Sequence, residues 1–350
     1  MKSVAATVLA AIVAAGSISA QETQTAPDQA WSLKAGDQFS TQVTVNIDME
    51  MEMPGMPMGA GGQQFHVQYQ LDHKVTETAD GASKVDATIG PVIAKIIMPM
   101  MGEMAYNSAE DDEQNPMRGV RHLVGKTFSY GIDTSGKISD VSGGDALVEE
   151  AAEAAAGENT GGGGGGMMMM DPAALAQIAM VLFRDDTLAT SLSIHTHVLP
   201  GAGAGGATYS MDREESIATV GKIKFKADCT AEAADGKTKI TYTGKDIGFE
   251  APDLPADDGN PMAAMQRKLL QGLKVTRSAV SGTAHFDKAL GRVVSSESVR
   301  EVDQEGELPE ELKQMMQMQG APVEDGMMMK RKSKLTVKVE EVGGEDRRRF

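Results

Sequence analysis

Residues 65–71 (FHVQYQL) and residues 80–85 (DGASKV) decide the fold class of this 350-residue chain. In the first stretch apolar and polar residues alternate, which is typical of an antiparallel strand with one buried face. In the second, an Asp-Gly pair stands between two alternating runs, and this dipeptide favours a tight hairpin turn. The sequence therefore predicts antiparallel β-hairpins.

The same alternation recurs along the chain, in residues 42–47, 222–225, 239–242 and 334–339. Helical signals are fewer. They predict a short helix after Pro116 and others over residues 146–156, 171–183 and 262–270. The predicted fold class is mainly β, or α+β, with antiparallel curved sheets or half-barrel-like units and a few short helices.

Self-similarity indicates a tandem duplication. Residues 80–85 resemble residues 235–240, and residues 130–138 resemble residues 285–293 at nearly the same offset. A third landmark, an Asp-Asp pair followed by Asn-Pro-Met, starts at Asp111 and again at Asp257. The predicted organisation is a signal peptide at 1–20, a first β-rich unit at 31–144, a helical and Gly/Met-rich connector at 145–183, a second β-rich unit at 184–342 and a basic tail at 343–350.

Charge and targeting signals restrict the partners. The chain has 33 basic and 50 acidic residues and a formal net charge of −17, so nucleic acid is an unfavourable partner. Lys2 and the apolar residues 4–15 form an export signal too short to span a bilayer, with cleavage near Ala20. We therefore expect a periplasmic or extracellular protein without integral membrane insertion.

Methionine and histidine supply the candidate metal ligands. Met49, Met51, Met53, Met56 and Met58 fall within ten residues, and closely spaced thioethers suit Cu(I). The alternative interpretation is a low-complexity insertion or adaptable packing where aromatic residues are scarce. A second, weaker candidate is His195 with His197: on a strand the two imidazoles would share a face, as in some zinc sites.

Catalytic patterns are missing from the sequence, so we expect no enzyme and no cofactor. Ser193 precedes His195 without a nucleophile elbow. Three acidic pairs, at 111–112, 185–186 and 257–258, could act as acid/base carboxylates. Two of them, at 111–112 and 257–258, occupy equivalent positions ahead of Asn-Pro-Met, so a solvated loop with a helix N-cap role explains them better. Cys229, the single cysteine, excludes an intrachain disulfide, and its alternation with Phe225 and Ala227 predicts a buried structural thiol.

Short motifs add a family resemblance. Residues 31–39 contain a G-D-x-F opening, and later pieces read Y-N-S, L-V-G and D-x-x-G-x-I, beginning at Gly36, Tyr106, Leu123 and Asp133 respectively. Leu199-Pro200 then precedes the Gly206–Tyr209 segment (GATY). Together these resemble an uncharacterised family of bacterial exported β-rich proteins. The resemblance implies export and a β-rich fold, and it implies no active site.

The function expected from these features is non-enzymatic. A curved sheet closed by helices would leave an aliphatic, Met-lined concavity for an apolar small ligand or an envelope protein. Two alternatives stay open: a Met-rich soft-metal (Cu(I)) binding protein, and a purely structural envelope protein.

Overall fold

A computed structural model describes residues 29–52, 61–98, 102–110, 112, 115, 117–158, 180–200, 207–217, 221–234, 236–250, 272–318 and 326–343. The predicted signal peptide, most of the basic tail, the predicted helix at 262–270 and most of the one at 171–183 lie outside these residues. Cleavage near Ala20 therefore stays a prediction. Among the described residues, no helix is both long enough and apolar enough to cross a membrane.

The described strands form a single antiparallel sheet of 12 strands. Their bounds are β1 Gln38–Glu52, β2 Gly61–Ala79, β3 Ala82–Met98, β4 Gly102–Asn107, β5 Thr127–Asp133, β6 Ile138–Ser142, β7 Thr208–Ile217, β8 Gly221–Ala234, β9 Lys237–Glu250, β10 Lys274–Asp287, β11 Arg292–Glu307 and β12 Met328–Glu341. The mainly antiparallel fold class is confirmed, including every alternating run that the sequence identified.

The strand order is β6-β5-β3-β2-β1-β12-β11-β10-β9-β8-β7, and β4 pairs with β3 off this path. The two predicted β-rich units therefore contribute to one sheet. They join where β1 pairs with β12 over a register from Thr41–Glu341 to Glu52–Lys330. The strands of each unit run in the same descending order across the sheet, while their origin by duplication stays a prediction.

Within the described residues the helices are few and short. They are α1 Gly144–Glu158, α3 Asp185–Thr196 and α5 Glu310–Met318, with 3-10 turns η1 Arg118–Leu123 and η3 Val181–Phe183. The helix predicted at 146–156 is confirmed by α1. The one predicted after Pro116 is the 3-10 turn η1.

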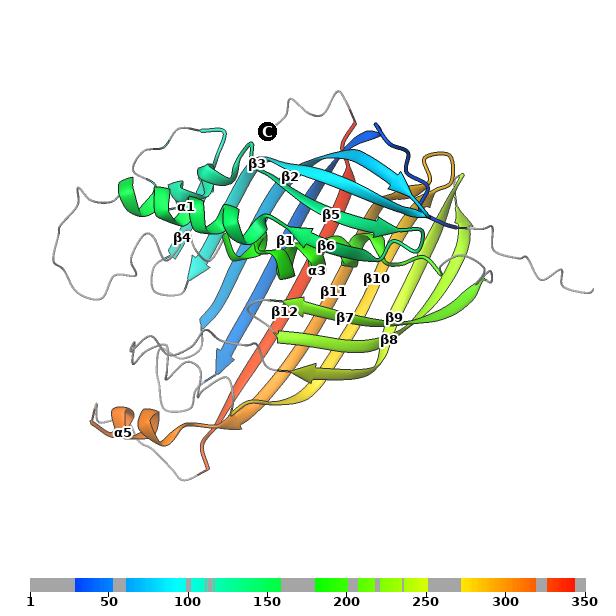
Figure 1. The fold of residues 1–350 in the computed structure, drawn as a ribbon. Coiled ribbons are helices and arrows are strands. Elements are labelled where there is room, and N and C mark those ends of the chain that lie inside the picture. Colours follow the sequence, from blue (N-terminus) through cyan, green and yellow to red (C-terminus); the bar gives the residue numbers. More distant parts are fainter. Residues whose placement is uncertain are drawn as a thin grey trace, which may run out of the picture.

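The sheet is strongly curved, and its two edge strands, β6 and β7, curl towards each other with α3 between them (Figure 1). Side chains on the concave face form one hydrophobic cluster with α3, which includes Val43, Tyr69, Leu188, Phe225 and Val337. An edge strand exposes unpaired backbone groups. Here α3 lies against both edges, and the amide of Ser216 on β7 donates to Thr190 Oγ1 at 3.0 Å.

The convex face is charged. Lys330, Lys332 and Lys334 on β12 each stand opposite an acidic residue on both neighbouring strands. Two of these pairs are within ion-pair distance, Lys334–Glu301 at 3.7 Å and Lys330–Glu305 at 3.5 Å. Opposite charges facing each other across strands support the register. The apolar surface of the sheet therefore lies on its concave side.

Candidate functional site on the concave face

The middle of the concave face is covered by α3, whose side chains enclose a small cavity against the sheet. Residues of α3 at helical spacing line it, namely Leu188, Ser191, Leu192, His195 and Thr196. From the sheet and the N-terminal segment it is lined by Trp31, Phe39, Thr41, Val43, Tyr69, Leu71, His73, Tyr130 and Val339. We call this space the α3 cavity. Its volume is about 20 Å³, which is room for about one water molecule.

The C-terminal turn of α3 is fixed by polar contacts. Trp31 Nε1 donates to the carbonyl oxygen of Thr196 at 3.2 Å, and Thr196 Oγ1 donates to the carbonyl oxygen of Gly136 at 2.6 Å. Gly136 has φ +81°, and a Cβ there would lie 2.0 Å from the Thr196 oxygen. Only glycine allows the β5–β6 turn to approach the helix this closely.

Buried histidines on both sides of the α3 cavity are hydrogen-bonded and neutral. His195 Nδ1 lies 2.9 Å from Ser296 Oγ, and His73 lies 2.8 Å from Thr41 Oγ1 and 3.1 Å from the Tyr130 hydroxyl. Burial lowers the pKa of His195 to about 4 and that of His73 to about 3. These side chains therefore stay uncharged near neutral pH.

The strand prediction for His195 and His197 is wrong. His195 is in the last turn of α3 and His197 is its C-cap, so the shared strand face that motivated a zinc site does not form. The segment also carries apolar residues at helical spacing, and these pack into the α3 cavity. Among the described residues, no group of three or more His, Cys, Asp or Glu side chains is placed to hold a metal ion.

The methionine cluster is described only in part. Met49 and Met51 are on β1, whereas Met53, Met56 and Met58 lie outside the described residues. Met49 Sδ accepts a hydrogen bond from Arg331 Nη2 at 3.4 Å. The Cu(I) site stays a prediction. The sequence predicts a concavity lined by aliphatic and methionine side chains. The side chains that line the α3 cavity are instead aromatic, aliphatic and polar.

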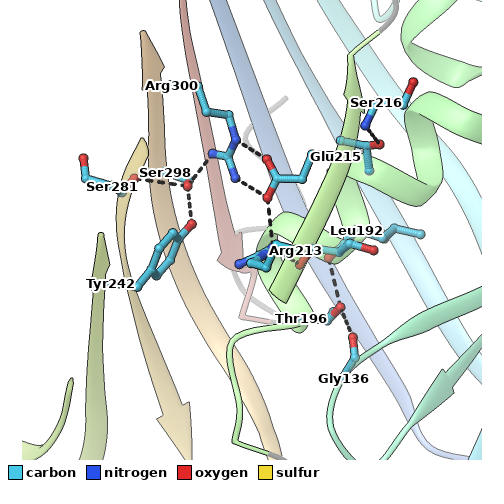
Figure 2. A network of polar contacts seen from close by, with 12 residues as sticks. Gly136, Leu192, Thr196, Arg213, Glu215, Ser216, Tyr242, Ser281, Ser298 and Arg300 are labelled. Atoms are coloured by element: carbon cyan, nitrogen blue, oxygen red, sulfur yellow. Dashed lines mark hydrogen bonds and ion pairs between the residues drawn. The ribbon is translucent and has the colours of Figure 1, made fainter. Parts of the chain in front are cut away.

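A cluster of buried charges occupies the concave face of the second half. Arg300 on β11 and Glu215 on β7 are each 1% exposed, and Arg300 Nη2 donates to Glu215 Oε1 at 2.7 Å while Arg300 Nε contacts Oε2. Arg213 Nη2 lies 3.1 Å from Glu215 Oε1. We call these three side chains the Arg–Glu cluster (Figure 2).

The Arg–Glu cluster joins elements that are not neighbours in the sheet. Strands β8, β9 and β10 separate β7 from β11, so the ion pair crosses the hollow side of the curl. Arg213 Nη2 also donates to the Ser193 carbonyl oxygen of α3 at 2.9 Å. Ser298 contacts both Arg300 and the Tyr242 hydroxyl. The cluster therefore holds the β7 edge and α3 against the rest of the sheet.

Electrostatics keep the cluster ionised. Burial would raise the pKa of Glu215, but the Arg300 and Arg213 guanidiniums outweigh it and hold that pKa below its ordinary value. Burial would likewise lower the pKa of Arg300, and the Glu215 carboxylate outweighs it and raises that pKa. Glu215 and Arg300 are therefore both charged at neutral pH.

Other candidate groups have structural roles. Cys229 is buried and unpaired beside Phe225 and Ala227, as predicted, and burial raises the pKa of its thiol to about 11. Asp185 and Asp186 are in the first turn of α3, where Asp185 Oδ1 accepts a hydrogen bond from the Gly144 amide at 2.7 Å.

Comparison with known proteins gives a family without an assigned function. Residues 80–203 match the model of a family of unknown function, DUF6263. The predicted resemblance to an uncharacterised family is confirmed over this part of the chain, which extends from the β2–β3 turn to just beyond α3. No curated protein matches the sequence.

Similarities to solved structures are weak. A lipovitellin structure, described under lipid–protein interactions, has a TM-score of 0.42 and 9% identity over 89% of this chain and 26% of that chain. This chain thus spans about a quarter of that lipovitellin chain. An outer membrane channel from Pseudomonas putida F1 has a TM-score of 0.22, 5% identity and coverage of 89% and 97%. A DUF1329 family protein from Desulfovibrio piger has a TM-score of 0.13, 8% identity and coverage of 87% and 86%.

Proposed function

We propose that this protein is a non-enzymatic binding protein, acting after export, that holds an apolar ligand on the concave face of its sheet. The strands of the sheet continue beyond α3 (Figure 1). The observation that supports this proposal is a set of apolar side chains near these strand ends that pack against the core but stay partly exposed. They lie on both halves of the sheet and include Met49, Phe65, Ile247 and Phe249.

Strand register assigns these side chains to the concave side. Phe65 stands directly opposite Ile47 on β1 and Ile96 on β3, and both partners are buried. Phe249 stands opposite Ile223 on β8, which is 1% exposed. Residues directly opposite each other share a face of the sheet. The apolar surface therefore continues along the strands to their ends.

The α3 cavity is excluded as the ligand site while α3 is in place, because it has room for about one water molecule. Partly exposed apolar side chains gathered on one concave surface are typical of a binding site. This favours a ligand at the end of the concave face over a purely structural role. An envelope protein could occupy the same apolar surface by inserting an apolar segment, and it is the alternative partner.

An uncharged fluorescent probe tests the proposal. N-phenyl-1-naphthylamine should bind saturably to the full chain, with enhanced emission. Phe249→Ser should weaken binding by at least about tenfold, because a buried phenyl group contributes about 1.5–3 kcal/mol. The matched control is Leu290→Ser, which removes an apolar side chain that is 43% exposed in the β10–β11 turn.

The control should bind the probe as the unchanged chain does. Absence of saturable binding, or equal losses in Phe249→Ser and Leu290→Ser, would contradict a site on the concave face.

A further inference from the structure

The Arg–Glu cluster has one more positive than negative charge. Two guanidiniums share the single carboxylate of Glu215, and all three side chains are at most 2% exposed. The neighbouring His197 does not change this balance, since burial lowers its pKa to about 4 and leaves it neutral. An uncompensated buried charge is costly, so an anion at this position would stabilise the folded chain.

Arg213 carries the unsatisfied group. Its Nη2 atom contacts Glu215 and the Ser193 carbonyl oxygen. Its Nη1 atom is buried and has no hydrogen-bond partner in the part of the chain that the structure describes. The guanidinium carbon lies 5.8 Å from the Phe225 ring centre and 5.4 Å from that of Tyr242. Aromatic faces attract the charge, but they do not replace an oxygen acceptor for the N–H groups.

A row of inward-facing side chains on β7, β8 and β9 leads from Arg213 towards the end of the sheet, and its members on β8 and β9 are apolar. Arg213 stands opposite Phe225, and the next inward positions bring Glu215 opposite Ile223 and Ile223 opposite Phe249. Strand β7 ends at Ile217, four residues beyond Arg213. At about 3.3 Å per residue, this row covers roughly 7 Å between Arg213 and the level of Phe249, and β7 itself continues to roughly 13 Å from Arg213. It combines a buried cation with an apolar path to partly exposed side chains.

We propose that Arg213 binds the carboxylate of an amphipathic ligand whose apolar tail lies along Phe225, Ile223 and Phe249. This inference rests on the proposed function and names its ligand class, a long-chain carboxylic acid. The Arg–Glu cluster has one excess positive charge, and the Nη1 atom of Arg213 is the group left to bind a ligand. Both match a singly charged head group better than a phosphate with two charges. The tail leaves the sheet at the partly exposed end.

The ligand reaches Arg213 by separation of α3 from β7. The Arg213 side chain is buried, and β7 is an edge strand held to α3 through Arg213 and Thr190. Edge elements with few backbone partners open at lower free energy than central strands. Binding therefore exchanges the contact between α3 and β7 for contacts with the ligand.

Competition between a charged and an uncharged form of one ligand tests this inference. Dodecanoic acid and methyl dodecanoate should both displace N-phenyl-1-naphthylamine from the full chain at pH 8, below their aggregation limits. The acid should bind at least tenfold more tightly, because a hydrogen bond to a charged group is worth more than a neutral one. Arg213→Gln should abolish this preference, so that the variant binds the acid no more tightly than the ester.

The matched control is Arg277→Gln, which removes a convex-face guanidinium that is 64% exposed and paired with Glu301 at 3.2 Å. It should keep the preference for the acid. Equal affinities for acid and ester in the unchanged chain would overturn the inference even if Arg213→Gln failed to fold, and would leave the proposed function standing. Failure of the probe itself to bind would contradict the proposed function.

Discussion

At the scale of single residues, Glu215 supplies the negative charge that compensates the buried Arg213 and Arg300 guanidiniums on the concave face. Its carboxylate contacts both guanidiniums of the Arg–Glu cluster, from a strand that does not pair with β11. Buried ion pairs add little net stability over apolar packing, but removal of one partner leaves a charge without compensation. The cluster is therefore sensitive to the loss of its one negative charge.

Glu215→Gln should lower the free energy of unfolding by about 3–5 kcal/mol, because two buried guanidiniums lose their counter-charge. Urea denaturation followed by circular dichroism measures the loss. Glu250→Gln is the matched control, since Glu250 forms an exposed ion pair with Lys224 at 2.7 Å and should leave the midpoint unchanged. Equal midpoints for both variants would show that the cluster does not hold β7 in place.

Part of the Arg–Glu cluster could be predicted from the residue pattern of β7. Arg213 and Glu215 alternate with Met211 and Ile217, so β7 has charged residues at inward positions between apolar ones. Such a pattern signals a buried polar contact. The partner, Arg300, is 85 residues away from Glu215, and only the curl of the sheet brings them together. Local alternation predicts a residue's face and carries no information on contacts across the hollow side.

At the scale of elements, the strands and their turns could be predicted from the sequence, whereas the helix α3 could not. Strand alternation and the Asp80-Gly81 turn follow from local chemistry, and both residues of that turn have positive φ. The segment from Leu192 to Val198 alternates in the same way, yet the part up to Thr196 is helical. It satisfies two periodicities, and packing of its helical stripe against Tyr69, His73 and Val339 favours the helix.

Gly136→Ala should destabilise the junction between α3 and the β5–β6 turn. A Cβ at this position has an unfavourable φ and would meet the Thr196 oxygen and Trp31 Nε1. Overpacking costs about 1–3 kcal/mol beyond the backbone strain. Gly236→Ala is the matched control, because Gly236 has φ +77° and nothing within 4 Å of its added Cβ, so it should lose only about 1–2 kcal/mol.

Thermal or urea unfolding of the two alanine variants measures this difference. Tryptophan emission reports on the contact between Gly136 and α3, since Trp31 is the only tryptophan of the sequence. The Trp31 side chain should become more exposed in Gly136→Ala and not in Gly236→Ala. Equal stability and equal emission in both variants would contradict a close contact between Gly136 and α3.

At the scale of the whole molecule, the chain is one curved sheet with an apolar hollow side and a charged outer side. The sequence predicts both faces, because side chains alternate along each strand. It leaves open whether the two β-rich units would share a sheet, since strand pairing between β1 and β12 joins segments almost 300 residues apart. The ligand site that we propose depends on the curl of the sheet, which brings β7 and β11 together across the concave side.

Native mass spectrometry of the protein tests the central claim most directly. The protein would be purified without detergent or chelator from the compartment to which we expect it to be exported. A bound species with the mass of a long-chain carboxylic acid is the predicted result, and it should be lost in Arg213→Gln and retained in Arg277→Gln. A copper adduct would favour the methionine cluster instead, and a ligand-free mass under these conditions would contradict the binding function.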